Sequence, residues 1–504
     1  MSNLDKKKGL LNVFISVSFR IILLFAAIFV RRYLIKYVGN EVNGINSLYL
    51  SIIGFLSVAE LGIGNAITFC MYKPIVEKEW DKVSALYQLL KKLYLIIGGI
   101  ILTVGLCIMP FLPYLAKGYQ SIDINLYSTF LLMLISVVLT YLYSAKTSLI
   151  NAYKNDYITT TISSLGNVLQ YILQIIVVVV TRSFVAYLFC RIIAVTIQWV
   201  FTELFTRKEY KCIISKKSYV TPETKTEVIH NFKAMFMHKV GYVLVNTLDS
   251  MIISAFIGVV VLGKYSNYTT IMTSMVAVLN LFFTPLTSVI GHLFVEESKQ
   301  KVKSYYNFFY GFNYVVGVVF FLGYYAVIDN IIEICFGNGL ELSSQIVFVI
   351  TLNYFIQFMR KSTLLFRDAT GTFYNDRWKP IFEGGLNLIL SIIFVQWFDI
   401  VGVIVATIIT NLFICHVIEP YVLHKYAFCM SAKKFCLQNY LYILGFTIIL
   451  SVAKFCMIEC DNAFFELMIN GTISLGFSIP LGIVMLFVNA DFRNYTFRFI
   501  KKNK

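Results

Sequence analysis

The sequence predicts an all-α protein that crosses a membrane many times, and three observations lead to this fold class. Of its 504 residues, 58% are hydrophobic and only 14% are charged, and the mean hydropathy is +0.74. Soluble domains carry about 25% charged residues, so the charge deficit is too large for a chain built of water-exposed domains. Apolar stretches long enough to span a bilayer follow one another along the whole chain. This composition excludes a soluble enzyme and a soluble nucleic-acid-binding protein.

Fourteen apolar stretches are predicted to form transmembrane helices. Their lengths are close to the roughly 20 residues that an α-helix needs to cross the hydrocarbon core. The first stretch follows three lysines and ends at Arg31 and Arg32 rather than at small residues, so we interpret it as a span and not as a signal peptide. The predicted spans are 10–30, 44–71, 93–115, 126–145, 157–180, 183–205, 238–257, 267–293, 305–327, 343–359, 381–397, 401–422, 440–457 and 465–488.

The positive charges indicate how the chain is oriented. The sequence has 43 Lys and Arg against 27 Asp and Glu, a net charge of +16. If the N-terminus is cytoplasmic, 34 basic residues fall in inner segments and 7 in outer loops, while Arg20 and Arg191 fall within spans. Cytoplasmic loops of membrane proteins are enriched in Lys and Arg. We therefore expect both termini in the cytoplasm, and no basic surplus remains that would require nucleic acid as a partner.

An internal repeat divides the chain into halves. Residues 37–49 (YVGNEVNGINSLY) align without gaps with residues 256–268 (FIGVVVLGKYSNY), and five positions are identical. Both copies follow the first span of a set of six, so the two sets enter the membrane in the same direction. Parallel repeats of this kind form two lobes around a central cavity. The predicted domains are an N-terminal six-helix lobe at 1–206, a cytoplasmic linker at 207–235, a C-terminal six-helix lobe at 236–424, and two additional helices with a basic tail at 425–504.

One inner segment is predicted to be a surface helix. In residues 73–92, Val83, Leu86 and Leu90 recur at helical spacing among charged residues. This pattern is typical of an amphipathic helix that lies on the membrane face.

Ionisable residues in the middle of spans mark candidate functional positions, because each costs about 2.5 to 3.5 kcal/mol to insert. Arg20 lies ten residues from either end of its span. It either pairs with Glu60 on the next span or faces the cavity and binds an anionic head group, to which a guanidinium offers forked donors. Glu60 lies beside Gly62 and Gly64, which favours close helix packing and the ion pair. A site for proton or sodium coupling at Glu60 is the alternative.

Four further ionisable residues complete the candidate set. Asp249 and Arg191 each lie eight residues from the outer end of their span. For Asp249, local hydrogen bonding near water and ion coupling both stay open. Lys239 and Arg360 lie at inner span ends, where long basic side chains usually reach back to water but can also form the rim of an inward-open cavity. The predicted substrate-binding residues are Arg20, Arg191, Lys239 and Arg360, and the predicted ion-coupling or ion-pairing residues are Glu60 and Asp249.

No metal site, cofactor or catalytic motif is predicted. The ten cysteines form no CxxC pair, and none of the five histidines has zinc-ligand spacing to a cysteine. The sequence lacks GxSxG, HExxH and GxxxxGK[ST] motifs. The longest outer loop is also short for a membrane glycosyltransferase. A polysaccharide polymerase or ligase with its site inside the bilayer stays as an alternative from a different class of protein.

Three stretches resemble the Wzx-type repeat-unit flippases of bacterial polysaccharide assembly. They are SLYLSIIGFLSVAELGIGNAITFCMYKPIVEKEWDKVSALYQLLKKLY at 47–94, FRDATGTFYNDRWKPIFEGGLNLILSIIFV at 366–395 and FDIVGVIVATIIT at 398–410. Within them, AELGIG…YKP and NDRWKP…E…N are the more specific patterns. The Wzx-type family is part of the superfamily that also holds the MATE antiporters and the lipid II flippases.

This resemblance implies a function. Such proteins translocate undecaprenyl-diphosphate-linked oligosaccharide from the cytoplasmic to the outer leaflet by alternating access and without ATP, for capsule, exopolysaccharide or O-antigen. The resemblance implies a location in the bacterial plasma membrane, with the polysaccharide polymerase and the chain-length machinery as candidate partners. A basic residue of span 1 lines the cavity of lipid II flippases, and Arg20 is the matching residue here. A MATE-like cation or drug antiporter is the alternative, and its cavity would need acidic residues more than basic ones.

Overall fold

The computed structural model describes residues 3–60, 62–216, 218–219, 221–222, 228, 243, 247–283, 286–460 and 462–502. In this part of the chain the regular secondary structure is helical and no strand occurs. Nine helical segments of the same part are long and apolar enough to cross a membrane. The predicted all-α, multi-pass membrane architecture is confirmed, whereas the count of fourteen spans stays a prediction.

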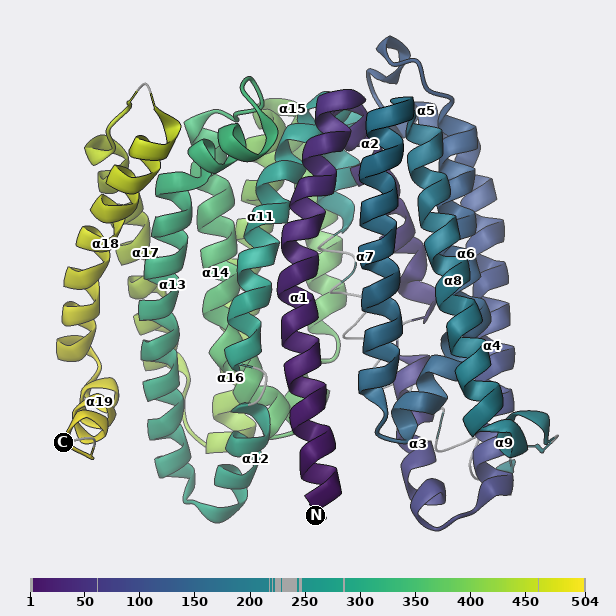
Figure 1. Ribbon diagram of the computed structural model, residues 1–504. Coiled ribbons are helices and arrows are strands. Elements are labelled where there is room, and N and C mark those ends of the chain that lie inside the picture. The colour runs from purple at the N-terminus through teal and green to yellow at the C-terminus, as the bar shows by residue number, and fades with distance from the viewer. Residues whose placement is uncertain are drawn as a thin grey trace. The chain divides into compact units, whose positions relative to one another are not determined.

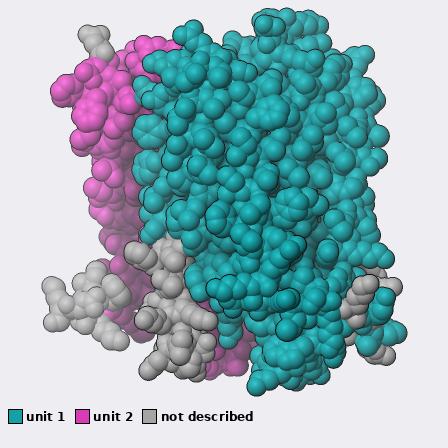
Figure 2. Space-filling model, turned by 45° about the vertical axis from the view of Figure 1, so that its right-hand side comes forward, with its two compact units in different colours: residues 1–263 teal, residues 264–504 magenta. Residues whose placement is uncertain are grey.

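The chain forms two compact units, residues 1–263 and 264–504, which Figure 2 shows in different colours. A further helix of the first unit lies at Thr247–Ile257 and ends in a π-helical turn. Figure 1 labels the other helices of this unit along the chain: α1 (Asn3–Tyr37), α2 (Asn40–Leu56), α3 (Ile63–Val76), α4 (Trp80–Ile108), α5 (Leu112–Leu115), α6 (Leu126–Ala152), α7 (Asp156–Thr181), α8 (Phe184–Glu209) and α9 (Lys211–Ser215).

The second unit is also built of helices. The helix α11 (Val259–Phe283) begins in the first unit and continues into the second. The remaining helices of this unit are α12 (Leu286–Glu296), α13 (Lys299–Phe336), α14 (Ser344–Ala369), α15 (Lys379–Thr410), α16 (His416–Val422), α17 (Lys433–Cys456), α18 (Ala463–Val488) and α19 (Ala490–Lys502).

Local sequence signals set several helix ends. The side chain of Asn125 accepts hydrogen bonds from the N–H groups of Tyr127 and Ser128, at 3.0 and 3.1 Å, and so caps the start of α6. Inside α15, Asp399 has a φ of 48°, which turns the chain sharply. This turn lies between the predicted spans 381–397 and 401–422, so α15 changes direction at the boundary that the sequence predicts.

The second predicted span, 44–71, is not one continuous helix. The helix α2 ends at Leu56, a 3₁₀ turn covers Ser57–Glu60, and α3 begins at Ile63. Gly62 has a φ of 93°, a left-handed conformation that glycine adopts without strain. Such a break frees backbone N–H and C=O groups, which membrane proteins tolerate only inside protein or beside a water-filled cavity. The break therefore points to a polar cavity next to Glu60.

The first predicted helix does not end at residue 30, while the membrane boundary of the first span stays a prediction. The helix α1 continues through Arg31 and Arg32 to Tyr37, so these residues and Lys36 belong to a helix rather than to an outer loop. The reason is local, because no glycine or proline follows the apolar run before Gly39, where the helix ends.

The predicted surface helix at 73–92 is also wrong. The helix α3 continues to Val76, and α4 starts at Trp80 and runs without a break into its span. Val83, Leu86 and Leu90 are fully buried. Beside them, Ser84 donates hydrogen bonds to the carbonyl groups of Ile213 and Lys216, at 2.8 and 2.7 Å. The apolar stripe of this segment thus lies on protein, around α9, instead of on lipid.

Candidate functional site

A polar cavity lies inside the first unit beside the break between α2 and α3. Its volume is about 350 Å³. Among the described residues that line it, ten of thirteen carry a hydroxyl, and Glu60 is the one charged residue. The 3₁₀ turn, α4, α6, α7 and α8 all contribute. The lining residues are Glu60, Tyr94, Thr140, Tyr143, Ser144, Thr147, Ser148, Thr159, Thr160, Ile162, Ser163, Gln198 and Thr202.

The carboxylate of Glu60 is held by a tyrosine of α6. The Tyr141 hydroxyl donates a hydrogen bond to Glu60 Oε2 at 2.8 Å. Tyr94 of α4 packs closely on Gly64, so that a Cβ atom added at Gly64 would overlap the Tyr94 hydroxyl. The stretch AELGIG therefore supplies the acid of the cavity and the small residue that admits a neighbouring aromatic ring.

The amide of Gln198 is held on the other side of the cavity. Gln198 Oε1 accepts a hydrogen bond from the Tyr143 hydroxyl at 3.1 Å, and its Nε2 donates to Asn167 Oδ1 at 3.2 Å. A Cβ at Gly166 would overlap the Gln198 side chain, so α7 approaches α8 closely at this point. These hydrogen bonds fix the orientation of the amide.

The lining defines what the cavity can bind. Hydroxyls and amides can both donate and accept hydrogen bonds, and hydroxyls that already donate within their helix, such as those of Thr140, Ser144 and Ser163, can still accept one. The lining therefore matches a ligand with many polar, uncharged groups, of which a sugar is the typical case. A single carboxylate can in addition hold one proton or one cation. The cavity therefore has the chemistry for a neutral polar ligand and for one exchangeable positive charge.

The hydroxyls of this cavity were not predicted, since all but those of Thr147 and Ser148 lie in stretches read as apolar spans. One signal was present in the sequence. Thr140, Tyr143, Ser144 and Thr147 have the spacing i, i+3, i+4, i+7, which places them on one face of α6. A polar stripe on a membrane-spanning helix indicates an interior or water-facing side.

Two predicted site residues lie outside what the structure describes. Arg20 is part of α1, but its side chain is not among the described ones, and Lys239 lies outside the described residues. The ion pair between Arg20 and Glu60 stays a prediction. Asp249 is described, and it is buried in the helix Thr247–Ile257.

Arg191 and Arg31 come close to the same tyrosine in the first unit. Arg191 of α8 lies near Tyr171 and Tyr187. Arg31 of α1 also lies near Tyr187. Arg191 does not line the cavity beside Glu60. The nearness of Arg31 to Tyr187 was missed because Arg31 was expected in a loop.

Arg360 lies in a buried cluster of four charges in the second unit, the charge quartet of Arg360, Lys379, Glu383 and Glu419. Its guanidinium donates to Glu419 at 2.6 and 3.1 Å, to Glu383 at 3.4 Å and to Asn411 at 2.6 Å. Lys379 lies between the two carboxylates, 3.1 Å from Glu383 and 2.5 Å from Glu419. Two cations thus balance two anions, and the quartet joins α14, α15 and α16.

The pattern NDRWKP…E…N contributes directly to this quartet. Lys379, Glu383 and Asn387 have i, i+4, i+8 spacing on one face of α15, and all three are buried. Asn387 donates to the Thr407 hydroxyl at 2.9 Å. In the same pattern, Asp376 accepts a hydrogen bond from Arg367 at 2.9 Å. Four residues of this pattern, Asp376, Lys379, Glu383 and Asn387, are therefore buried and held by polar partners.

Three solved structures share the fold of this chain. The first is the lipid II flippase MurJ in an inward closed conformation, with a TM-score of 0.64 and 17% identity over 94% of this chain and 98% of that one. The second is an inward-facing multidrug resistance MATE family transporter of the MOP superfamily, with a TM-score of 0.60 and 13% identity over 86% of this chain and 98% of that one. The third is an outward-facing multidrug resistance MATE family transporter of the MOP superfamily, with a TM-score of 0.54 and 12% identity over 86% of this chain and 96% of that one.

Comparisons of sequence alone find less. No protein-family model and no curated protein matches this sequence. The likeness to the solved structures, at 12 to 17% identity, is one of architecture. The chain is a multi-pass membrane protein with the fold seen in the flippase MurJ and in MATE family transporters.

Proposed function

We propose that the protein is a flippase that moves a lipid-linked oligosaccharide from the cytoplasmic to the outer leaflet by alternating access. The observation that carries the proposal is the hydroxyl-rich cavity beside Glu60. It occurs in a fold shared with a lipid II flippase over 94% of the chain. Sugar hydroxyls need neutral donors and acceptors, and the cavity offers them on four helices.

The topology of the proposal follows from the sequence. Two six-helix lobes, at 1–206 and 236–424, are joined by a cytoplasmic linker and followed by two helices. The distribution of 34 inner against 7 outer basic residues supports cytoplasmic termini in a bacterial plasma membrane. The proposed product is a repeat unit for capsule, exopolysaccharide or O-antigen, so the polymerase and the chain-length machinery are the proposed partners.

We assign the lipid diphosphate to the basic residues of the predicted set, with Arg20 first and Arg191 and Lys239 in support. Arg360 already donates to Glu419, Glu383 and Asn411, so it would have to exchange carboxylates for phosphate. Arg20 is preferred because a guanidinium in the middle of a span needs an anionic partner. Forked donors also match phosphate oxygens better than an ammonium does.

Replacing Arg20 by alanine is expected to reduce export of surface polysaccharide about tenfold, because loss of a hydrogen bond to a charged group costs about 1.5 kcal/mol or more. Arg20→Lys keeps the charge and is expected to retain a large part of the export. Cell-surface polysaccharide is measured at matched protein levels. Full export by Arg20→Ala would remove Arg20 from the substrate site.

The acidic residue of the cavity supports a second candidate function, a proton-coupled cation antiporter. Glu60 is the one charged group among the described lining residues, which is the balance expected for a cationic cargo. The two candidates are separated in proteoliposomes. Labelled undecaprenyl-diphosphate oligosaccharide that changes leaflet indicates the flippase, while exchange of ethidium for protons without lipid transfer indicates the antiporter.

For the flippase, Glu60 is the proposed coupling residue. One proton moved along a gradient of one pH unit supplies about 1.4 kcal/mol, or a factor of about ten in the leaflet ratio. We expect this factor in the wild type and in Tyr141→Phe, which keeps the carboxylate. Glu60→Gln is expected to transfer lipid without responding to the gradient. A full response in Glu60→Gln would show that coupling, if present, lies elsewhere.

A further inference from the structure

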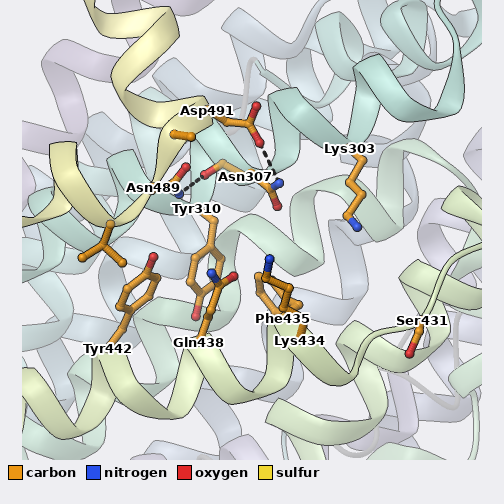
Figure 3. A pocket seen from close by; sticks show the side chains of 12 residues that line it. Lys303, Asn307, Tyr310, Ser431, Lys434, Phe435, Gln438, Tyr442, Asn489 and Asp491 are labelled. Carbon is orange, nitrogen blue, oxygen red and sulfur yellow. Dashed lines mark hydrogen bonds between the residues drawn. The ribbon is translucent and has the colours of Figure 1, made fainter.

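A second polar cavity, of about 240 Å³, lies within the second unit and plays no part in the proposed transport path. It is formed where α13 and α17 begin and where α18 gives way to α19. Figure 3 shows Lys303 on one side of this cavity, Lys434 beside Phe435 on α17, and Asn489 and Asp491 above Tyr310. We call it the lysine pocket, after Lys303 and Lys434.

The lysine pocket lies at the ends of helices and not in the middle of spans. Lys303 is four residues after the first residue of α13, and Lys434 is the second residue of α17. Asn489 directly follows the last residue of α18. At 1.5 Å per residue, these positions are within about 6 Å of the helix ends. The predicted spans 305–327 and 465–488 also end beside Lys303 and Asn489, so the predicted topology puts the pocket at the cytoplasmic membrane–water interface.

The two lysines of the pocket keep their charge available. In the described part of the chain, neither ammonium group makes a hydrogen bond or an ion pair. Asp491 also lines the pocket, but its two carboxylate oxygens accept hydrogen bonds from the Ser304 hydroxyl and, at 2.8 Å, from the Asn307 amide. Neutral donors thus hold the acid in place, and with two lysines and one aspartate the charged groups of the lining sum to +1.

The walls of the pocket are held by hydrogen bonds. Asn489 Nδ2 donates to the carbonyl oxygen of Asn307 at 3.0 Å, which ties the end of α18 to α13. The Tyr310 hydroxyl donates to Asn439 Oδ1, and Asn439 Nδ2 donates to His416 Nδ1 at 2.7 Å. His416 Nε2 then donates to the Ile356 carbonyl at 3.0 Å. The pocket is therefore shaped before a ligand arrives.

The helix next to the pocket carries further positive charge. The aromatic face of α19 packs on α13, with Phe492 stacked on Phe308 at 5.9 Å and Tyr495 tilted against Tyr305 at 5.0 Å between ring centroids. Its sequence also carries four basic residues, including Arg493 and Arg498. Each basic residue close to a membrane surface attracts anionic lipid by about 1 kcal/mol.

We propose that the lysine pocket binds the phosphate of an anionic phospholipid head group from the cytoplasmic leaflet. The two lysines contact the phosphate oxygens, and the amide of Gln438, at the same wall as Lys434, donates to the head group. Basic pockets between membrane helices bind lipid head groups in this way. The interfacial level of the pocket favours lipid over a soluble anion, because the acyl chains of such a lipid stay in the bilayer.

The test compares two double variants that remove the same charge from the same helices. Lys303→Gln with Lys434→Gln changes the pocket, whereas Lys301→Gln with Lys433→Gln changes exposed neighbours that do not line it. Full-length protein is placed in nanodiscs of phosphatidylcholine with a minor fraction of phosphatidylglycerol, extracted, and analysed for bound phosphatidylglycerol by native mass spectrometry. A parallel thermal-shift series uses inorganic phosphate in lipid-free detergent.

The wild type and the Lys301/Lys433 control are expected to retain phosphatidylglycerol about tenfold better than the Lys303/Lys434 variant, since each lost charge-assisted hydrogen bond costs about 1.5 kcal/mol or more. Equal retention by the two double variants would overturn the proposal. Equal stabilisation by inorganic phosphate alone would assign the pocket to a free anion and would also overturn it. Neither result depends on transport, so both are separate from the proposed flippase function.

Discussion

Glu419→Gln is expected to lower the stability of the folded protein by about 3 to 5 kcal/mol, the cost of leaving a buried charge without its partner. Glu419 is 1% exposed and accepts hydrogen bonds from both Arg360 and Lys379. After the change, Arg360 and Lys379 share Glu383 alone, and the new amide directs N–H groups at one of them. Protein level in membranes and the midpoint of thermal unfolding in detergent measure the effect.

Two comparisons make this prediction specific. Glu297→Gln removes a carboxylate from an exposed i, i+4 pair with Lys301, and it is expected to change stability by less than about 1 kcal/mol. In the double variant Lys379→Met with Glu419→Gln, one cation, Arg360, again faces one anion, Glu383. This variant is expected to recover a large part of the lost stability. If Glu419→Gln unfolds at the same temperature as Glu297→Gln, the quartet does not stabilise the fold.

The quartet also determines how Arg360 can be tested as a substrate residue. Arg360→Ala leaves two buried carboxylates with one lysine, so a loss of polysaccharide export in this variant will combine misfolding with any loss of binding. Arg360→Met combined with Glu383→Gln keeps the Lys379–Glu419 pair and the charge balance. Export by that double variant, at matched protein level, reports on the binding role alone.

The sequence predicted those features of the fold that depend on a single segment, such as the position of a helix. In the described part of the chain, helices lie at every span that the length and regular spacing of the apolar stretches predict. These local properties suffice because a helix forms all its backbone hydrogen bonds within its own segment. The break after Leu56 was not predicted, although Gly62 and Gly64 lie beside it. Glycines in a span are equally consistent with close helix packing, and only the neighbouring helices decide between the two.

The sites were predicted less well because they depend on contacts between distant segments. Glu60 was recognised as an acid within a span, but the hydroxyls around it come from four helices, each of which contributes only part of the lining. Arg360 was expected at the rim of a cavity, while Glu419, its main partner, is 59 residues away along the chain. A sequence lists both charges and does not show which spans bring them together.

The internal repeat is the long-range feature that the sequence did reveal, and the structure adds its geometry. Gly39 and Gly258, which align in the repeat, have closely similar backbone angles, φ 118° and ψ 157° against φ 134° and ψ 165°. Each directly precedes a helix, α2 and α11. Asn40 Nδ2 donates to the Val260 carbonyl at 3.0 Å, and Asn43 Nδ2 donates to the Gly263 carbonyl at 3.2 Å. Residues 40–43 and 260–263 thus pack on one another within the first unit.

The crossing of these helices depends on two glycines that are equivalent in the repeat. A Cβ at Gly44 would overlap the carbonyl oxygen of Val259, and a Cβ at Gly263 would overlap the backbone of Asn40. Because the offset of the repeat is 219 residues, each contact maps onto the other. This reciprocity is that of a local two-fold axis, and it explains why the repeat keeps glycine at both positions.

Gly44→Ala is therefore expected to destabilise the protein by about 3 kcal/mol, the upper part of the range for overpacking, because a backbone carbonyl cannot rotate away as a side chain can. Gly99→Ala is the matched control, since it also lies inside a helix but has no atom within 4 Å of its added Cβ. That change is expected to be neutral or stabilising, as alanine favours a helix by about 1 kcal/mol over glycine.

The double variant Gly44→Ala with Gly263→Ala tests whether the two glycines act at one crossing. Once the first methyl group has separated the helices, the second meets less resistance, so the double variant is expected to cost less than the sum of the single variants. Thermal unfolding of the four proteins in the same detergent measures this coupling. Strictly additive effects would mean that Gly44 and Gly263 act at independent contacts. The two glycines would then be equivalent in the sequence repeat without stabilising the same helix crossing.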